Sequence, residues 1–253
     1  MPSLIELIGD KNISWTSVNR LLFNHVRESH DKALLVGGEI IKDANFFTIL
    51  KNKYEGNGLS DSMFDFYNFI FKKLNALLSK EEKSLLQSTI LNIMTDMSRN
   101  YLNFIGELAV LYAFKASGEF TLLRVEEKLH SDKNTSADFL FKNKQDGQDL
   151  LIEVLNLHIE KLDFNSLEHL KFWLDSKYNK KKRDKFVNDE KEVFIQPVIW
   201  VKSEEQLKNL ERLYCETNYS IDYINIPMSM LTYLIDGSSY EHRFEPVTTI
   251  LKN

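Results

Sequence analysis

The sequence predicts an α/β protein in which a mixed central sheet flanked by helices follows a helical region. Apolar residues recur at helical spacing in the first half, as in "SDSMFDFYNFIFKKLNALLS". The later segment "VFIQPVIWV" is almost entirely apolar, as expected of a strand buried on both faces. Around it, short apolar runs and helical patterns follow one another in the order helix, strand, strand, strand, helix, strand. This order is typical of a mixed sheet covered by helices.

Near Ser98 the sequence changes from helical patterns alone to a mixture of helix and strand patterns, and this change predicts the domain organisation. We expect a helical N-terminal region over residues 1–97 and an α/β domain over residues 98–253. In the first region, apolar periodicity predicts helices over residues 14–29 and 60–79. The apolar stripe expected for the second of these helices consists of Met63, Phe66, Phe69, Ile70, Leu74 and Leu77.

The α/β domain is expected to begin with a helix over residues 100–118 that ends at Gly118, a residue suited to a left-handed helix stop. The dipeptide Asp146-Gly147 favours a hairpin between two of the strands that follow. The predicted strands cover residues 120–128, 137–141, 149–159, 193–201 and 221–227. The remaining predicted helices cover residues 166–186, 203–216 and 228–236.

Composition restricts the possible classes of function. The chain has 253 residues, a net charge of −5 and a single cysteine, Cys215, which excludes an internal disulfide and a cysteine-rich zinc site. No secretory signal pattern and no membrane-spanning apolar run is present, so we expect a cytoplasmic protein without membrane contact. No P-loop, GxGxxG, GxSxG or HExxH motif occurs. The net charge leaves nucleic-acid binding open, because a local basic surface suffices for it.

Three carboxylates stand in otherwise apolar elements. Glu107 lies on or beside the apolar stripe of its helix, Asp138 starts a strand, and Glu153 is the only charged residue between Leu150 and Leu157. A buried carboxylate is costly unless it is paired or bound to a cation. If the three acids converge, a divalent cation such as Mg²⁺ or Mn²⁺ would remove their mutual repulsion.

Each acid also has a purely structural interpretation. Glu107 could form a salt bridge with a basic residue. Asp138 could cap the turn before its strand. Glu153 could lie on the solvent-exposed face of an edge strand.

The arrangement of these acids resembles the PD-(D/E)XK nuclease superfamily, which has the restriction-endonuclease-like fold. The matching segments are "GELAVLYAF", "SADFLF", "LLIEVLN" and "FIQPVIWV", and the resemblance covers roughly residues 100–201. The resemblance implies a metal-dependent nuclease in which a water molecule attacks a phosphodiester bond, with DNA as the expected substrate. It assigns Mg²⁺ or Mn²⁺ binding to Asp138, Glu153, Glu107 and the main-chain carbonyl of Val154.

One departure from the family pattern concerns the lysine that orients the attacking water. Leu155 stands in its place, and leucine cannot perform this role. A basic or polar group from elsewhere could substitute, and the candidates are Asn156, His158, Lys161, Lys177 and Lys181. The alternative is a catalytically decayed nuclease-like fold that serves as a nucleic-acid- or protein-binding module.

The segment "KYNKKKRDKF" is the strongest local concentration of positive charge. It could bind the phosphate backbone of a nucleic acid, or it could be a solvated helix end whose cations favour the helix dipole. The residues expected to bind nucleic acid are Lys177, Lys180, Lys181, Lys182 and Arg183. A homo-oligomer or a protein partner could also bind through aromatic residues of "FDFYNFIF" in the N-terminal helical region.

Overall fold

The computed structural model describes residues 2–9, 16, 20, 46, 53–54, 56, 58–96, 100–129, 135–159, 162–185, 193–201, 203–225, 227–234 and 240–247. The chain forms two compact units, Met1–Tyr112 and Ala113–Asn253. This division falls later in the chain than the boundary after residue 97 that the sequence predicts. Most of the helix predicted over residues 14–29 lies outside the described residues. No helix among the described residues is long and apolar enough to cross a membrane.

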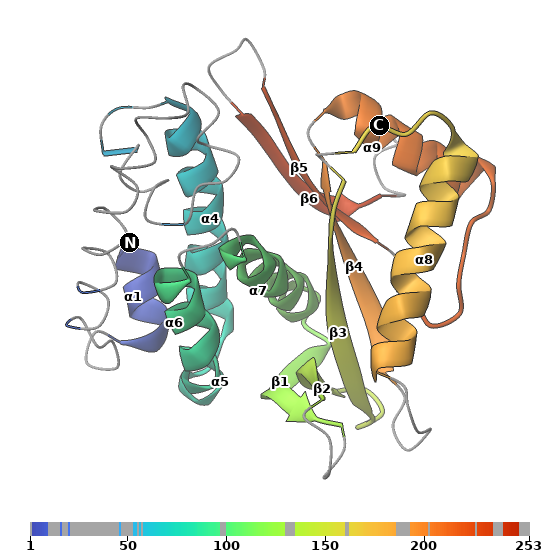
Figure 1. Cartoon of the computed structure of the whole chain (residues 1–253). Coiled ribbons are helices and arrows are strands. Elements are labelled where there is room, and N and C mark those ends of the chain that lie inside the picture. Colours follow the sequence, from blue (N-terminus) through green and yellow to red (C-terminus); the bar gives the residue numbers. More distant parts are fainter. Residues whose placement is uncertain are drawn as a thin grey trace. The chain divides into compact units, whose positions relative to one another are not determined.

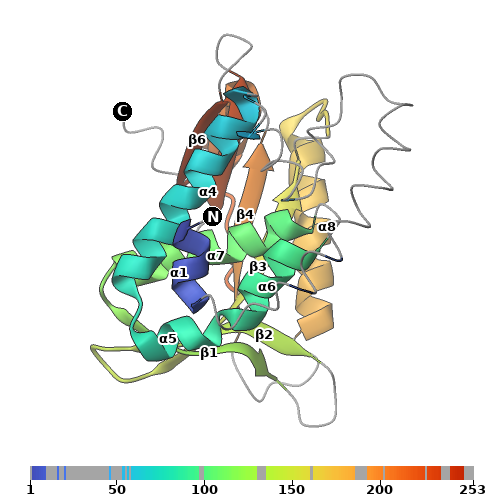
Figure 2. The same cartoon turned by 90° about the vertical axis from the view of Figure 1, so that its left-hand side faces the viewer.

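The described part of the first unit is helical, and Figure 2 shows its helices from the side. The helix α1 packs against α4, and Ser79 starts α5 with a capping box in which its side chain accepts from the N–H of Glu82. The helices are α1 (Pro2–Ile8), α4 (Gly58–Leu77), α5 (Lys80–Leu85), α6 (Gln87–Thr95) and α7 (Tyr101–Ala116), whose last turn belongs to the second unit.

The buried face of α4 differs from the predicted stripe. Ile70 and Leu74 are buried as expected, but Phe69 is 45% exposed and Leu77 is 39% exposed. The helix instead buries Phe64, Tyr67 and Phe71, and Leu78 directly after it is buried as well. The segment is aromatic on several sides, so apolar spacing alone fits two neighbouring stripes, and the buried one packs Phe64 against Phe46 and Tyr67 against Tyr101. The exposed Phe69 is compatible with the predicted interaction through this region, which stays a prediction.

The second unit contains a six-stranded mixed sheet in the order β1-β2-β3-β4-β5-β6. β1 to β3 are antiparallel, β3 to β5 are parallel, and β6 is antiparallel to β5. The α/β class with a mixed sheet is therefore confirmed. The strands are β1 (Phe120–Lys128), β2 (Ser136–Asn143), β3 (Asp149–His158), β4 (Val193–Val201), β5 (Met228–Leu234) and β6 (Tyr240–Pro246).

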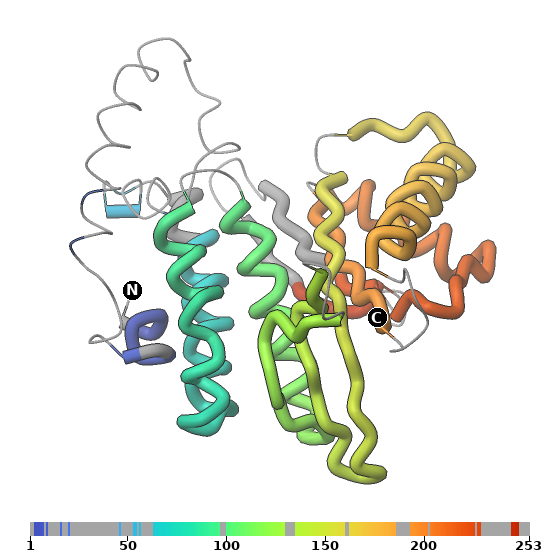
Figure 3. The backbone as a smooth tube through the Cα atoms, turned by 60° about the horizontal axis from the view of Figure 1, so that its bottom comes forward, coloured from blue at the N-terminus to red at the C-terminus, as the bar shows by residue number. Residues whose placement is uncertain are grey.

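Local sequence explains the hairpin between β2 and β3, which Figure 3 follows as a continuous tube. Gly147 takes a left-handed conformation with φ of 73°, and its N–H donates to the carbonyl of Asn143. The side chain of Asp146 accepts from the N–H of Gln148 and fixes the turn. The predicted turn is thus confirmed.

Two helices of the second unit cover one face of this sheet. They are α8 (Leu167–Lys185) and α9 (Glu204–Glu211), and a π-helical segment (Arg212–Glu216) follows α9 directly. Figure 1 shows α8 alongside β3 and β4, which it connects. Leu170, Leu174 and Tyr178 of α8 belong to one buried core with side chains of β3, β4 and α9. This crossover between two parallel strands brings the charged end of α8 next to β3.

The C-terminal part of the sequence prediction is wrong in two places. Within the described residues of the segment 221–227, the backbone forms an isolated bridge, Ile195 with Ile224, instead of the predicted strand. The segment predicted as a helix over residues 228–236 begins with β5. Met and Leu favour helices, but pairing of this backbone with β4 on one side and β6 on the other overrides that propensity.

Candidate metal and phosphate site

Asp138 and Glu153 lie where β2 and β3 separate. The pairing of these strands runs from Lys142 with Asp149 to Phe139 with Ile152, and the two acids are the next residues on each strand. Side chains alternate between the faces of a sheet, so Asp138 and Glu153 share a face. The structure therefore brings together two of the three predicted acids.

The side chain of Asp138, and not a main-chain carbonyl of β2, accepts the next hydrogen bond from β3. Its Oδ2 accepts a hydrogen bond of 2.6 Å from the N–H of Val154. This hydrogen bond joins two strands across the end of the hairpin, so Asp138 does not cap the turn before its own strand. The carbonyl of a strand residue points to the same edge as its N–H, so the Val154 carbonyl also faces the side of β3 on which Asp138 lies.

Burial raises the pKa of Asp138 to about 7, and the neighbouring charge of Glu153 acts in the same direction. The hydrogen bond from Val154 and the ammonium groups of Lys181 and Lys185 act in the opposite direction but do not outweigh these effects. Near neutral pH, Asp138 is thus an acid that can either hold a proton or, once a cation approaches, lose it.

Glu153 is 1% exposed, and its strand lies between β2 and β4. The interpretation of Glu153 as a solvent-exposed residue of an edge strand is therefore wrong. Its Oε1 forms an ion pair with Lys181 and a second one, at 3.0 Å, with Lys185. Lys185 also donates a hydrogen bond of 2.5 Å to the main-chain carbonyl of Ser136 at the start of β2.

The two carboxylate oxygens of Glu153 differ in their surroundings. Oε2 is buried and accepts no hydrogen bond among the residues that the structure describes. An unsatisfied oxygen of a buried carboxylate carries a large desolvation cost unless a cation or a water molecule meets it. This oxygen is therefore the point of the site at which a further ligand is expected.

Leu155, Asn156 and His158 place no cationic group beside Glu153. Leu155 packs against the core beneath α8. Asn156 and His158 alternate to the opposite face, where Asn156 Oδ1 accepts from Trp200 Nε1 at 2.9 Å and the His158 ring stacks on Trp200. Lys161 lies outside the described residues. Of the basic candidates on α8, Lys181 is the one that contacts Glu153.

Lys185 was not among the residues predicted for the site. A signal for it is present in the sequence, because Lys185 follows Lys181 by four positions and residues at that spacing share one face of a helix. The basic segment is accordingly divided among several roles. Lys182 lies over the ring of Tyr223 at 4.2 Å, Lys177 lies over the ring of Trp173 at 5.2 Å, and Arg183 is exposed.

Glu107 lies in α7, in the part of that helix that belongs to the first unit, and it is half-buried. Its participation in the site stays a prediction. Among the described residues, no group of three or more His, Cys, Asp or Glu side chains is placed to hold a metal ion. Within the described part of the second unit, the acids available to a cation at this point are thus the pair Asp138 and Glu153.

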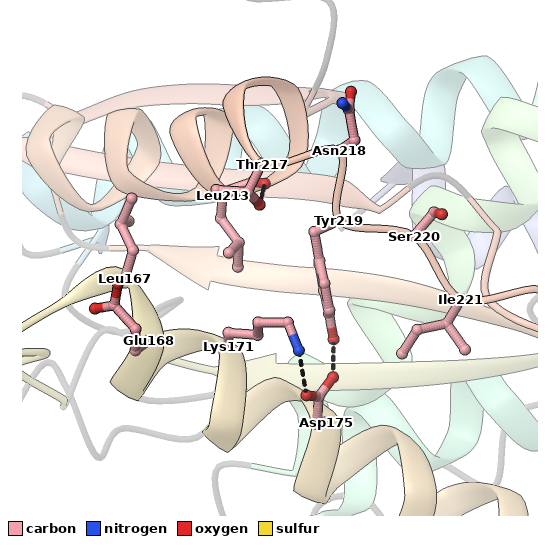
Figure 4. A pocket seen from close by; sticks show the side chains of 10 residues that line it. All are labelled: Leu167, Glu168, Lys171, Asp175, Leu213, Thr217, Asn218, Tyr219, Ser220 and Ile221. Atoms are coloured by element: carbon pink, nitrogen blue, oxygen red, sulfur yellow. Dashed lines mark hydrogen bonds and ion pairs between the residues drawn. The ribbon is translucent and has the colours of Figure 1, made fainter.

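A separate cavity of about 350 Å³ lies between α8 and the segment after the π-helical turn. Asp175 is held there on both oxygens, by Lys171 at 3.0 Å and by the hydroxyl of Tyr219 at 2.5 Å, as Figure 4 shows. Burial and the carboxylate of Asp175 raise the pKa of Tyr219, so its hydroxyl stays a neutral donor. The hydrogen bond to Asp175 links Tyr219 to α8, and the cluster contains neither Asp138 nor Glu153.

The chain was compared with protein-family models, curated proteins and solved structures, and none of them matches it.

Proposed function

We propose that the second unit is a metal-dependent nuclease with a restriction-endonuclease-like fold, which hydrolyses phosphodiester bonds in DNA. The observation that carries the proposal is the pair of half-buried Asp138 and buried Glu153, in which Oε2 of Glu153 accepts no hydrogen bond from the described residues. The order α7, β1, β2, β3, α8, β4 is the one that the resemblance to PD-(D/E)XK nucleases implies. It supports the fold part of the proposal.

The residues present fit a hard divalent cation such as Mg²⁺ or Mn²⁺. Such ions prefer oxygen ligands, and the site offers the carboxylates of Asp138 and Glu153 together with the main-chain carbonyl of Val154. Glu107 belongs to the first unit, and its role in metal binding stays a prediction. When bound, the cation supplies an activated water molecule and polarises the phosphate.

Lys181 takes the role that Leu155 cannot fill. Its ammonium group already contacts Glu153, so it lies within reach of a phosphate that approaches the same carboxylate. There it stabilises the negative charge that develops on the phosphate oxygens during hydrolysis. Lys185 acts differently, because its bond to the Ser136 carbonyl ties it to β2 and lets it orient Glu153.

A second candidate is a nucleic-acid- or protein-binding module without catalysis. One observation favours it: Lys181 and Lys185 neutralise Glu153 without any metal ion. A cation must compete with these lysines for the carboxylate, and a decayed site could persist in this self-neutralised state.

Nicking of supercoiled plasmid with Mg²⁺ or Mn²⁺ separates these candidates. We expect the wild type to cut, and Asp138→Ala and Glu153→Ala each to abolish cutting. Asp149→Ala is the matched control, because Asp149 is an exposed acid at the start of the same strand as Glu153. An inert wild type that still binds DNA would establish the binding module, and cutting that survives both alanine variants would overturn the assignment of the site.

A further inference from the structure

A second feature of this part of the molecule is a cavity of about 370 Å³ between β3 and α8. It begins at Lys181, the partner of Glu153, and its volume lies in the range of small-ligand sites. Its lining consists of Leu155, Asn156, Leu157 and His158 of β3 and Trp173, Lys177, Lys180, Lys181 and Asp184 of α8.

The lining changes in character along the cavity. Lys177, Lys180 and Lys181 supply three ammonium groups from α8, against the single acid Asp184. Trp173 lies eight positions before Lys181, which on a helix is about 12 Å along the axis. The cationic part of the cavity therefore adjoins the acid pair, and an aromatic part lies farther from it.

The aromatic part offers planar surfaces. Trp173 is half-buried, packs edge-to-face against Phe164 at 5.8 Å between ring centroids, and carries the Lys177 ammonium over its ring. The ring of His158 does not contribute, because it stacks on Trp200 on the opposite face of the sheet. Ammonium groups beside aromatic rings match a phosphate joined to a nucleobase.

We propose that this cavity binds one unpaired nucleotide of the strand to be cut, with its phosphate at the lysines and its base against Trp173. The inference rests on the proposed function, because it takes the substrate of the acid pair to be a nucleic acid. A base inside a duplex is stacked and paired and cannot enter such a cavity. The substrate class is therefore single-stranded or locally unpaired nucleic acid.

The test measures binding to the full chain without divalent metal, so that no cleavage takes place. The probes are a fluorescein-labelled single strand of about 15 nucleotides and its duplex, followed by fluorescence anisotropy. We expect the single strand to bind at least about tenfold more tightly than the duplex, and Trp173→Ala to weaken its binding by about tenfold. Phe172→Ala is the matched control, because Phe172 neighbours Trp173 on α8 and is 74% exposed but does not line the cavity.

Lys177→Ala provides a second variant in case Trp173→Ala fails to fold, because Lys177 is exposed and its removal leaves the core intact. We expect it to weaken single-strand binding severalfold and duplex binding to a smaller extent. Equal binding of both probes, or single-strand binding that neither variant weakens, would overturn the inference.

Plasmid nicking with metal keeps this inference distinct from the proposed function. A protein that fails to nick but loses single-strand binding in Trp173→Ala supports the cavity and removes the nuclease. A protein that nicks in a manner dependent on Asp138, but binds single strands equally well with and without Trp173, supports the nuclease and removes the cavity as its substrate site.

Discussion

Lys181 of α8 forms an ion pair with Glu153 of β3, a carboxylate that is almost fully buried. Lys185, one helical turn further along, forms a second ion pair with the same oxygen at 3.0 Å. The strand itself carries a leucine at position 155, and the cation beside this carboxylate comes from the crossover helix. This relationship defines what each lysine is expected to do.

Removal of Lys181 should reduce cleavage far more than it reduces stability. We expect Lys181→Ala to lower the nicking rate by about 10²–10³-fold, because it takes away a positive group aimed at the developing phosphate charge. Lys185 still pairs with Glu153 in this variant, so the carboxylate is not left without a counter-charge. The measurement is plasmid nicking in parallel with urea unfolding.

Lys171→Ala is the control for this comparison. It removes an ion pair with Asp175 from the same helix, in the separate cavity that neither acid of the site lines. Its nicking rate should equal that of the wild type. If Lys181→Ala and Lys171→Ala cut equally well, the cation required for hydrolysis must come from another residue.

The raised pKa of Asp138 predicts a pH dependence of stability in the metal-free protein. The folded chain holds this proton up to about pH 7, whereas the ordinary pKa of the group is 3.8. Stability therefore falls as pH rises from about 4 to about 7 and is then constant with respect to this group. At about 1.4 kcal/mol per pKa unit, the decrease is at most about 4 kcal/mol.

Asp138→Asn should remove this dependence, because the amide is never charged and its oxygen can still accept from Val154. We expect the variant to be more stable than the wild type at about pH 8 and nearly equal to it at about pH 4, by urea unfolding. Asp149→Asn, at an exposed position of β3, should change neither value. An advantage of Asp138→Asn that is the same at both pH values would contradict the assignment of the raised pKa to Asp138.

The local signals that the sequence carries are strong for the first four strands and weaker for the last two. Gly147 largely determines the β2–β3 turn, and the almost entirely apolar sequence of β4 largely determines that strand. β5 shows the opposite case, because its Met and Leu residues favour a helix and only pairing with β4 and β6 makes it a strand. Long-range pairing of this kind leaves no short-range signal in the sequence.

The candidate site was predictable as a pair of acids, because Asp138 and Glu153 interrupt apolar strands. The lysine that pairs with Glu153 was predictable only as one of several candidates. Asn156 and His158 are nearer to Glu153 in sequence, but strand alternation and the ring of Trp200 turn them to the other face. Lys181 is far away in sequence and close in space, because the crossover helix returns alongside β3.

The basic residues of α8 should differ in their effect on nucleic-acid binding. We expect Lys180→Glu and Arg183→Glu each to flatten the salt dependence of binding, by a slope of about 0.7–0.9 for each phosphate that the protein no longer neutralises. Lys171→Glu, on the first half of the helix, is the control. Binding measured from low to high salt would show unchanged slopes if the run were only a solvated helix end.

Leu155 permits a test of whether the lysine has moved to another element. Leu155 and Lys181 line the same cavity, and Leu155 lies two positions after Glu153 on the same face of β3. A lysine introduced at position 155 therefore starts close to the carboxylate that Lys181 contacts. In the wild-type background, Leu155→Lys should add little to the nicking rate, because the new ammonium group would crowd that of Lys181.

In the Lys181→Ala background, the same change should restore activity. We expect Leu155→Lys to raise the nicking rate of this variant by about tenfold or more, because it returns a positive charge to the site from the strand instead of the helix. Leu155→Met serves as the control for altered packing, since it has a similar volume without the charge. A double variant that stays as inactive as Lys181→Ala, while folding normally by circular dichroism, would show that Lys181 does more than supply a cation at this carboxylate. A lysine at position 155 of the strand could then not replace Lys181 of the helix.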